Sequence, residues 1–298
     1  MKSQSKCNFN GVISALTTPF LNGAVDYASL ERLVGYQIEN GINGFVINGT
    51  TAESPTLANE EVEKIFQVVK NVTNGQVPLI LGTGSNSTSL TVAQTQRAEA
   101  LGADAALVVV PYYNKPPQRG LEKHFSAVAN STKLPIILYN VPGRTITSMT
   151  AATVQSLSEI RNIIGIKEAS GDLSFDGELK ISLPKDFLML SGDDLTYLPF
   201  LKLGGHGIIS VMSNLIPAAC VRWTQWANEN NYAEAEDDFG KYKDLISLMY
   251  VEPNPIPIKW MLYKMGICKS PELRLPLDCL AESNFDNITN EMKKLGLQ

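Results

Sequence analysis

Short apolar runs alternate with longer segments of helical periodicity along most of the chain. The segment after the second run, for example, places Val62, Ile65, Phe66 and Val69 at the spacing of one helix face. The runs have strand length and strand composition, and each is followed by a segment long enough for a helix. The predicted strands are Val12–Leu16, Phe45–Asn48, Pro78–Leu81, Ala105–Val110, Pro135–Tyr139, Ile163–Lys167, Phe187–Leu190 and Gly207–Val211.

Eight strand–helix units in succession are typical of an α/β protein with a (β/α)8 TIM barrel. A doubly wound open sheet would also alternate strands with helices. However, no G-x-G-x-x-G follows the first strand, where a dinucleotide-binding sheet would carry it. The strand signal stops near Asn231, and amphipathic helical pattern continues to the C-terminus. We therefore predict a catalytic barrel over residues 1–230 and a C-terminal helical appendage over residues 231–298.

Charge and composition exclude several classes of partner. The net charge is −5 with acidic and basic residues interspersed, so no footprint for nucleic acid or an anionic membrane is expected. No apolar run approaches the length needed to cross a bilayer, and Met1–Asn10 lacks the apolar core of a signal peptide. The four cysteines, Cys7, Cys220, Cys268 and Cys279, have no paired spacing. Free thiols in a reducing cytoplasm are the expectation.

Lys167 is the least expected residue of the apolar runs, because it ends a strand that otherwise has core composition. Strict alternation predicts Ile164 and Ile166 on one face, and Ile163, Gly165 and Lys167 on the other. In a parallel sheet covered on both sides, both faces are dry. An ammonium is costly there, so burial is expected to favour the neutral amine, which attacks carbonyl carbons to form Schiff bases. The alternative is a lysine that reaches from the strand end into solvent.

Other polar residues follow the predicted strands at their carboxyl ends, where barrels of this kind carry their chemistry. Hydroxyls, phenols and one arginine meet there, a set that suits a carbonyl substrate bearing carboxylates. Threonine hydroxyls and backbone N–H groups would hold one carboxylate, an arginine fork a second, and a tyrosine would move protons. These segments are Gly49–Ser54, Gly82–Asn86, Pro111–Asn114, Tyr139–Arg144, Lys167–Glu168, Ser191–Asp194 and Gly207–Ser210.

Each of these residues also has an ordinary structural explanation when taken alone. Tyr139 would be a core residue, Arg144 a surface ion-pair partner, and Asp193–Asp194 a cap of the following helix. His124 and His206 are isolated and receive no catalytic role. Their joint placement at one end of the barrel is what favours a site.

Two other functions remain open at this point. Metal-dependent enolate chemistry would use Glu53, Glu168 and Asp193 as oxygen ligands. A non-catalytic ligand-binding barrel would need no buried amine, so the complete polar set argues against it.

The motifs at these strand ends resemble those of the dihydrodipicolinate synthase family, which belongs to the pyruvate aldolases and lyases that form Schiff bases. The resemblance extends from about Phe9 to the C-terminus, with the motifs in family order. They are Gly-Thr-Thr-x-Glu-Ser (49–54), Pro-Tyr-Tyr-Asn-Lys-Pro (111–116), Tyr-Asn-Val-Pro-x-Arg-Thr (139–145), Gly-Ile-Lys-Glu-Ala-Ser-Gly (165–171), Leu-Ser-Gly-Asp-Asp (190–194) and Glu-Pro-Asn-Pro-Ile-Pro-Ile-Lys (252–259).

The resemblance implies condensation of pyruvate with L-aspartate 4-semialdehyde, giving 4-hydroxy-tetrahydrodipicolinate for lysine and diaminopimelate biosynthesis. Lys167 would form the Schiff base, and Tyr139 would pass protons with Thr50 and with Tyr113, which a neighbouring subunit lends across a tight dimer. It further implies a homotetramer and no dissociable cofactor.

The family resemblance also assigns the substrate-binding residues. Thr51 would hold the pyruvate carboxylate, Arg144 the carboxylate of the aldehyde, and Gly192 and Ile209 would line the pocket. Related lyases acting on N-acetylneuraminate or 2-keto-3-deoxy sugar acids generally lack an arginine in the turn after the tyrosine strand. Arg144 therefore favours the synthase over a retro-aldol lyase, which is the alternative.

Three departures from the family pattern stand out. Ala52 replaces a usual glycine, so the turn either avoids a positive φ angle or tolerates one. Asn59, Val62 and Leu90 stand where lysine-inhibited members carry histidines and a glutamate, which implies weak or absent lysine feedback. The polar lead Met1–Asn8 has no assigned role.

Overall fold

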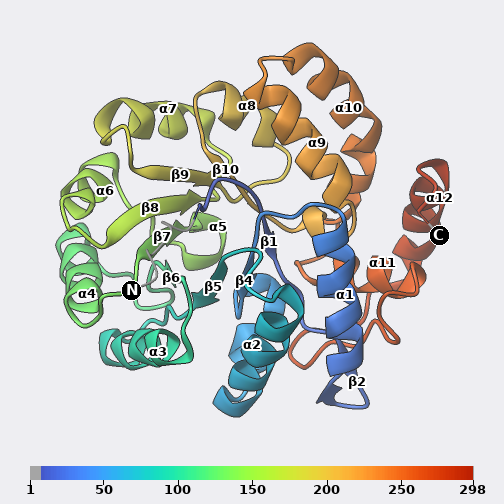
Figure 1. Cartoon of the computed structure of the whole chain (residues 1–298), viewed down its shortest axis with the longest axis horizontal. Helices are drawn as coiled ribbons and strands as arrows, with labels where there is room; N and C mark the ends of the chain where they lie inside the picture. Colours follow the sequence, from blue (N-terminus) through green and yellow to red (C-terminus); the bar gives the residue numbers. More distant parts are fainter. Residues whose placement is uncertain (1–7, 298) are drawn as a thin grey trace.

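Eight parallel strands close into a barrel in the order β1-β10-β9-β8-β7-β6-β5-β4 (Figure 1). The structure is a computed structural model, and it describes residues 8–297. The barrel that the apolar runs predict is therefore confirmed, with strand bounds that differ by at most one residue. The strands are β1 (Gly11–Ala15), β4 (Gly44–Ile47), β5 (Leu79–Gly82), β6 (Ala105–Val109), β7 (Ile136–Asn140), β8 (Ile163–Glu168), β9 (Leu188–Ser191) and β10 (Gly207–Ser210).

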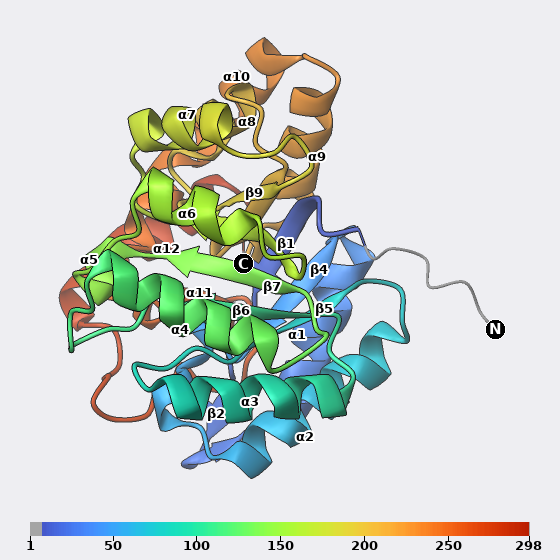
Figure 2. The same cartoon turned by 90° about the vertical axis from the view of Figure 1, so that its left-hand side faces the viewer.

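Helices cover the outside of the barrel, and in Figure 2 α6 and α4 lie on either side of strand β7. Short 3₁₀ turns lie at the mouth after β4 and β10 and near the C-terminus: η1 (Thr50–Ala52), η2 (Ser54–Thr56), η3 (Met212–Asn214) and η4 (Glu282–Asn284). The helices are α1 (Tyr27–Glu39), α2 (Asn59–Thr73), α3 (Thr88–Leu101), α4 (Gln118–Asn130), α5 (Pro142–Thr145), α6 (Ala151–Ser158), α7 (Leu173–Ser182), α8 (Tyr197–Lys202), α9 (Pro217–Asn228), α10 (Tyr232–Leu248), α11 (Ile256–Lys264) and α12 (Phe285–Lys294).

Side chains at the helix starts explain several boundaries. Asp26 accepts a hydrogen bond from the N–H of Ser29 at 3.1 Å, and Asp172 accepts one from the N–H of Ser174 at 2.9 Å. Each carboxylate satisfies a backbone donor that the first helical turn leaves free. These caps fix where α1 and α7 begin, and hence the lengths of the loops that leave the barrel mouth.

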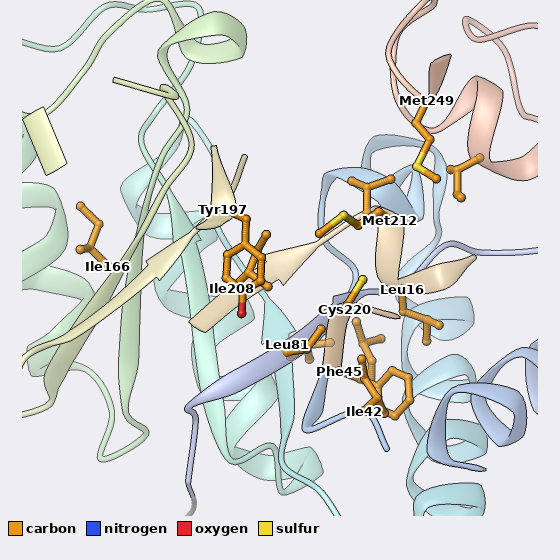
Figure 3. Close-up of a cluster of buried hydrophobic side chains, with 14 of the residues drawn as sticks. Leu16, Ile42, Phe45, Leu81, Ile166, Tyr197, Ile208, Met212, Cys220 and Met249 are labelled. Carbon is orange, nitrogen blue, oxygen red and sulfur yellow. The ribbon is translucent and has the colours of Figure 1, made fainter. Parts of the chain in front are cut away.

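Two apolar layers hold the barrel together. Alternate strand residues belong to the larger apolar cluster that the strands share with the helices. Figure 3 labels Leu81, Ile166 and Ile208 of the strands in this cluster, together with Tyr197 of α8 and Cys220 of α9. The other residues point inward and fill the barrel with a smaller apolar cluster, which lies among the strands and continues up to Tyr139. The interior is thus a packed core beneath the mouth, as expected for eight strands.

A short antiparallel hairpin between β1 and α1, formed by β2 (Phe20–Leu21) and β3 (Ala24–Val25), is not among the predicted elements. Its strands are only two residues long, so they give no measurable periodicity. Phe20 is fully buried and places an aromatic ring under the C-terminal segment.

The C-terminal helices follow the barrel in the expected positions. α10 contacts α9 and α8, and α12 contacts α10 (Figure 1). The division at residues 230 and 231 remains a prediction. No helix within residues 8–297 is long and apolar enough to cross a membrane.

Three of the cysteines are free thiols as expected, Cys220, Cys268 and Cys279. The fourth, Cys7, and all but the last residue of the polar lead lie outside the described residues.

His124 of α4 is buried, and its Nδ1 lies 2.9 Å from the hydroxyl of Thr88 at the start of α3. Its Nε2 has no hydrogen-bond partner among the described residues. Burial lowers the pKa of His124 to about 4 from an ordinary 6.5. It therefore joins two helices as a ring that is neutral near pH 7.

This burial predicts a specific loss of stability in acid. Below about pH 6.5 the unfolded chain protonates His124, whereas the folded chain does so only near pH 4, so the free energy of unfolding falls through that window. His124 contributes up to about 1.4 kcal/mol per pH unit to this fall in the free energy of unfolding. Denaturant titrations of wild type and His124→Gln should give curves whose difference changes across pH 6.5 to 4 and is flat above. A difference that stays constant with pH would contradict this account.

Candidate active site

Lys167 lies inside the barrel mouth, with only 6% of its surface exposed. Its Nζ is 4.3 Å from the centroid of the Tyr139 ring, which is equally buried. The two residues are paired in the register of β7 and β8, so the sheet itself holds them side by side. The expectation of a buried lysine is confirmed, and the solvent-facing alternative is wrong.

The alternation predicted for β8 is correct at its end and wrong at its beginning. Ile166 faces the helices, on the face opposite Lys167 as the alternation predicts. Ile163 also faces the helices, whereas Ile164 packs against the interior cluster. The cause is a register shift opposite Ile136 and Ile137 of β7, which adds one residue to β8 at that point. The strand thus resumes its alternation just before Lys167, which keeps the lysine on the interior face.

Gly192 clears the space that the lysine side chain occupies. A Cβ at Gly192 would lie 2.7 Å from Cε of Lys167 and 2.5 Å from Cβ of Ala169. The N–H of Gly192 donates to the carbonyl of Glu168 at 2.6 Å, which fixes the loop after β9 against the end of β8. Ile209 of β10 is buried in the interior cluster beneath the mouth. Gly192 therefore lies against the lysine side chain and Ile209 in the apolar core, and their role as a pocket lining remains a prediction.

Thr50 and Thr51 form a single 3₁₀ turn directly after β4. Thr51 is buried, and its hydroxyl accepts a hydrogen bond from Nδ2 of Asn254 at 3.0 Å. The sequence leaves open whether Ala52 adopts a positive φ angle. In the structure the residue with left-handed backbone is the next one, Glu53, with φ 58° and ψ 40°. The turn therefore avoids a positive φ at Ala52.

Arg144 lies in the short helix α5 after β7 and is exposed at the rim. Its guanidinium donates to the carbonyl of Asn254 at 3.1 Å. Asn254 thus contacts both residues expected to bind carboxylates, through its side-chain nitrogen on one side and its carbonyl on the other. Its Oδ1 is buried and has no partner within the described part of the chain.

Tyr113 is the one predicted site residue that the single chain does not bring to the others. It is 87% exposed and has a positive φ of 75°. Such exposure of a large aromatic side chain is expected for a residue that contacts a second subunit.

A cavity of about 280 Å³ connects Thr50 and Tyr139 with the outer side of the loops after β4, β5 and β6. Ser54, Leu90 and Tyr112 line its outer part. Asn59 and Val62 line a separate cavity of about 30 Å³ next to it. Within residues 8–297, no charged side chain lines the larger cavity.

The three carboxylates of the metal alternative are each engaged elsewhere. Glu53 pairs with Lys259, Asp193 accepts from the N–H and hydroxyl of Thr196, and Glu168 accepts from Nδ2 of Asn140 at 2.7 Å. Burial raises the pKa of Glu168, against the hydrogen bonds from Ser170 and Asn140 that lower it. No group of three or more metal-ligating side chains assembles anywhere in the described residues.

Asp194 does not cap the following helix, contrary to the structural explanation of the Asp193–Asp194 pair. It is buried, and its Oδ2 accepts from the N–H of Met212 at 2.8 Å and from the hydroxyl of Tyr250 at 2.8 Å. Asp193 alone serves the start of α8.

The fold and the rim together define a class, a (β/α)8 barrel with a buried lysine beside a tyrosine at the carboxyl ends of its strands. A model of the dihydrodipicolinate synthetase family matches residues 8–295. The chain belongs to this family.

Individual relatives cover the whole barrel and its C-terminal helices. The 4-hydroxy-tetrahydrodipicolinate synthase of Bdellovibrio bacteriovorus is 52% identical over 290 residues, which are 97% of this chain and 99% of the relative. The structure of dihydrodipicolinate synthase from Thermotoga maritima has a TM-score of 0.95 at 39% identity, over 97% of this chain and 99% of that one. A structure from Acinetobacter baumannii, described as a chloride-inhibited dihydrodipicolinate synthase complexed with pyruvate, has a TM-score of 0.95 at 42% identity, over 98% and 100%.

These comparisons confirm the family resemblance drawn from the motifs and the assignment to a lyase of this family. The retro-aldol alternative is not favoured by them.

Sequence reasoning missed two residues that contact the site, Asn254 and Lys259. Both lie in the Glu-Pro-Asn-Pro-Ile-Pro-Ile-Lys motif (252–259), to which no role was assigned. A signal for Lys259 was present, because it stands in the same kind of apolar run as Lys167, between Ile258 and Trp260.

Proposed function

We propose that this chain condenses pyruvate with L-aspartate 4-semialdehyde through a Schiff base on Lys167, giving 4-hydroxy-tetrahydrodipicolinate. The observation that carries the proposal is the burial of Lys167 against Tyr139 at the mouth of the barrel. A buried amine there has an enzymatic use and no packing use, which also argues against a binding-only barrel.

The proposed chemistry begins with addition of the Lys167 amine to the keto carbon of pyruvate. The carbinolamine loses water to give an iminium, and loss of a methyl proton gives an enamine. The enamine carbon attacks the aldehyde of the second substrate, and the amino group of that substrate then displaces Lys167 from the former keto carbon. The lysine is thus regenerated, and one water is released overall.

The other residues take the roles that their positions support. Tyr139 moves protons to and from the carbinolamine, in relay with Thr50 and with the Tyr113 of a second subunit. Thr51 holds the pyruvate carboxylate and Arg144 the carboxylate of the aldehyde, while Gly192 and Ile209 line the pocket. The amine itself activates the ketone, so we propose no cofactor. We further propose a homotetramer that works in the cytoplasm.

Reductive trapping tests the nucleophile directly. Borohydride added with pyruvate should attach one pyruvate per chain, and peptide mapping should place it on Lys167. Lys167→Arg should give no adduct and no measurable turnover, because a guanidinium does not form the Schiff base. Lys180→Arg, which changes a lysine on the outer helix α7, should behave as wild type. An adduct on another lysine, or none in wild type, would refute the proposal.

Subunit complementation tests the role of Tyr113. Lys167→Ala and Tyr113→Phe should each be poorly active alone. Mixed dimers of the two should regain activity, because the Tyr113→Phe subunit supplies Lys167 and its partner supplies Tyr113 to the same site. If Tyr113 served its own subunit, no mixed dimer would contain a complete site and activity would not return.

Lysine should inhibit the enzyme weakly or not at all. Leu90 lines the 280 Å³ cavity where a carboxylate would be needed to pair with the effector's ammonium group. The nearby Glu63 is already paired with Arg97 at 2.6 Å. Half-inhibition by lysine below millimolar concentration in a steady-state assay would contradict this prediction.

A further inference from the structure

The Glu53–Lys259 ion pair is the one salt bridge among residues 8–297 whose two side chains are both buried. Nζ of Lys259 lies 2.6 Å from Oε1 of Glu53, and the side chains are 2% and 0% exposed. The second oxygen, Oε2, accepts from the backbone N–H of Arg274 at 2.9 Å. Both oxygens of one carboxylate are therefore held by residues more than 200 positions later in the chain.

Glu53 is also the residue that ends the Thr50–Ala52 turn. Its N–H donates to the carbonyl of Thr50 at 3.1 Å, and its own carbonyl accepts from the N–H of Thr56 at 2.9 Å. Its φ of 58° and ψ of 40° lie in the left-handed region. For a residue with a long side chain this conformation costs on the order of 1 kcal/mol, so the surroundings must hold it in place.

The C-terminal segment provides that hold. Nζ of Lys259 lies 4.2 Å from the centroid of the Phe20 ring, and the Arg274 guanidinium lies 4.4 Å from the same centroid. Arg274 also binds both oxygens of Glu61, at 2.7 and 2.6 Å, and the carbonyl of Thr56 at 2.8 Å. The turn is thus fastened to α11 and to the loop after it.

Stability alone is a poor reason for this arrangement. Burial lowers the pKa of Lys259 even though Glu53 favours its charged form, so dehydration outweighs the pairing. Buried ion pairs of this kind are often no more stabilising than apolar side chains of similar volume. A dehydrated pair and a strained backbone therefore meet at a residue three positions after Thr50, where they fix geometry rather than add stability.

We propose that Glu53 and Lys259 are positioning residues, which hold the Thr50–Thr51 turn in its productive geometry by tying it to α11. The inference rests on the proposed function, since it assigns the pair a task in the same reaction. It is separate from the contact between Asn254 and the Thr51 hydroxyl, because Glu53 acts on the backbone of the turn. Helix α11 and the loop after it are on this view required for full catalytic activity.

Two variants test the pair, with a third as control. Glu53→Gln keeps the size of the side chain but leaves Lys259 without a counter-charge. The double variant Glu53→Gln/Lys259→Met removes both charges, so it keeps the experiment decisive if the single variant fails to fold. Asp238→Asn weakens the pair with Arg222 between α9 and α10, away from the barrel mouth. It should lower the melting temperature with kcat unchanged.

The readouts separate positioning from folding. At a temperature where circular dichroism shows each protein folded, the Glu53 variants should lose about 10- to 100-fold in kcat. Their KM for pyruvate should rise, while borohydride should still trap pyruvate on Lys167. A double variant with the kcat and KM of wild type would overturn the inference. Failure of wild type itself to trap pyruvate would instead refute the proposed function, so the two failures are distinguishable.

Discussion

Lys167 and Tyr139 lie side by side at the top of a barrel interior whose lower part is filled by apolar side chains. A closed parallel barrel offers few places where an amine can be kept from water yet reached by a substrate. The end of β8 is such a place because the neighbouring loop carries a glycine, whose missing Cβ makes room for the lysine side chain. The other proposed site residues have their roles only relative to this amine.

The sequence predicts the layers of the fold well, because the periodicity of its hydrophobic residues indicates which faces of the strands and helices are buried. Eight apolar runs give eight strands, and a lysine at the end of one of them gives a buried amine. The same reasoning fails at Ile163 and Ile164, since a bulge depends on how β7 pairs with β8 and leaves no mark in the composition of either strand. The hairpin at Phe20 is missed for a related reason, because two-residue strands have no period.

Contacts between segments that are distant in the sequence are harder to predict from the sequence. Asn254 meets Thr51 across 203 positions, and Lys259 meets Glu53 across 206. The sequence around each of these residues gives no indication of its distant partner. Composition does show that Lys259 is out of place in an apolar helix, as it does for Lys167, but only the fold reveals that one lysine is paired and the other faces a tyrosine. The sequence can thus predict that a charged side chain is buried, but it cannot predict which residues that side chain contacts.

The same long-range contacts bear on how the chain is divided. A boundary at residues 230 and 231 follows the end of the strand pattern, yet Asn254, Lys259 and Arg274 all bind the loop after β4. A barrel without these residues would leave the Glu53 carboxylate buried and unpaired, which costs about 3–5 kcal/mol when one partner of such a pair is lost. That is a large part of the stability of an ordinary domain. The segment from Asn254 to Arg274 therefore helps to hold the barrel mouth together, whichever way the chain is divided.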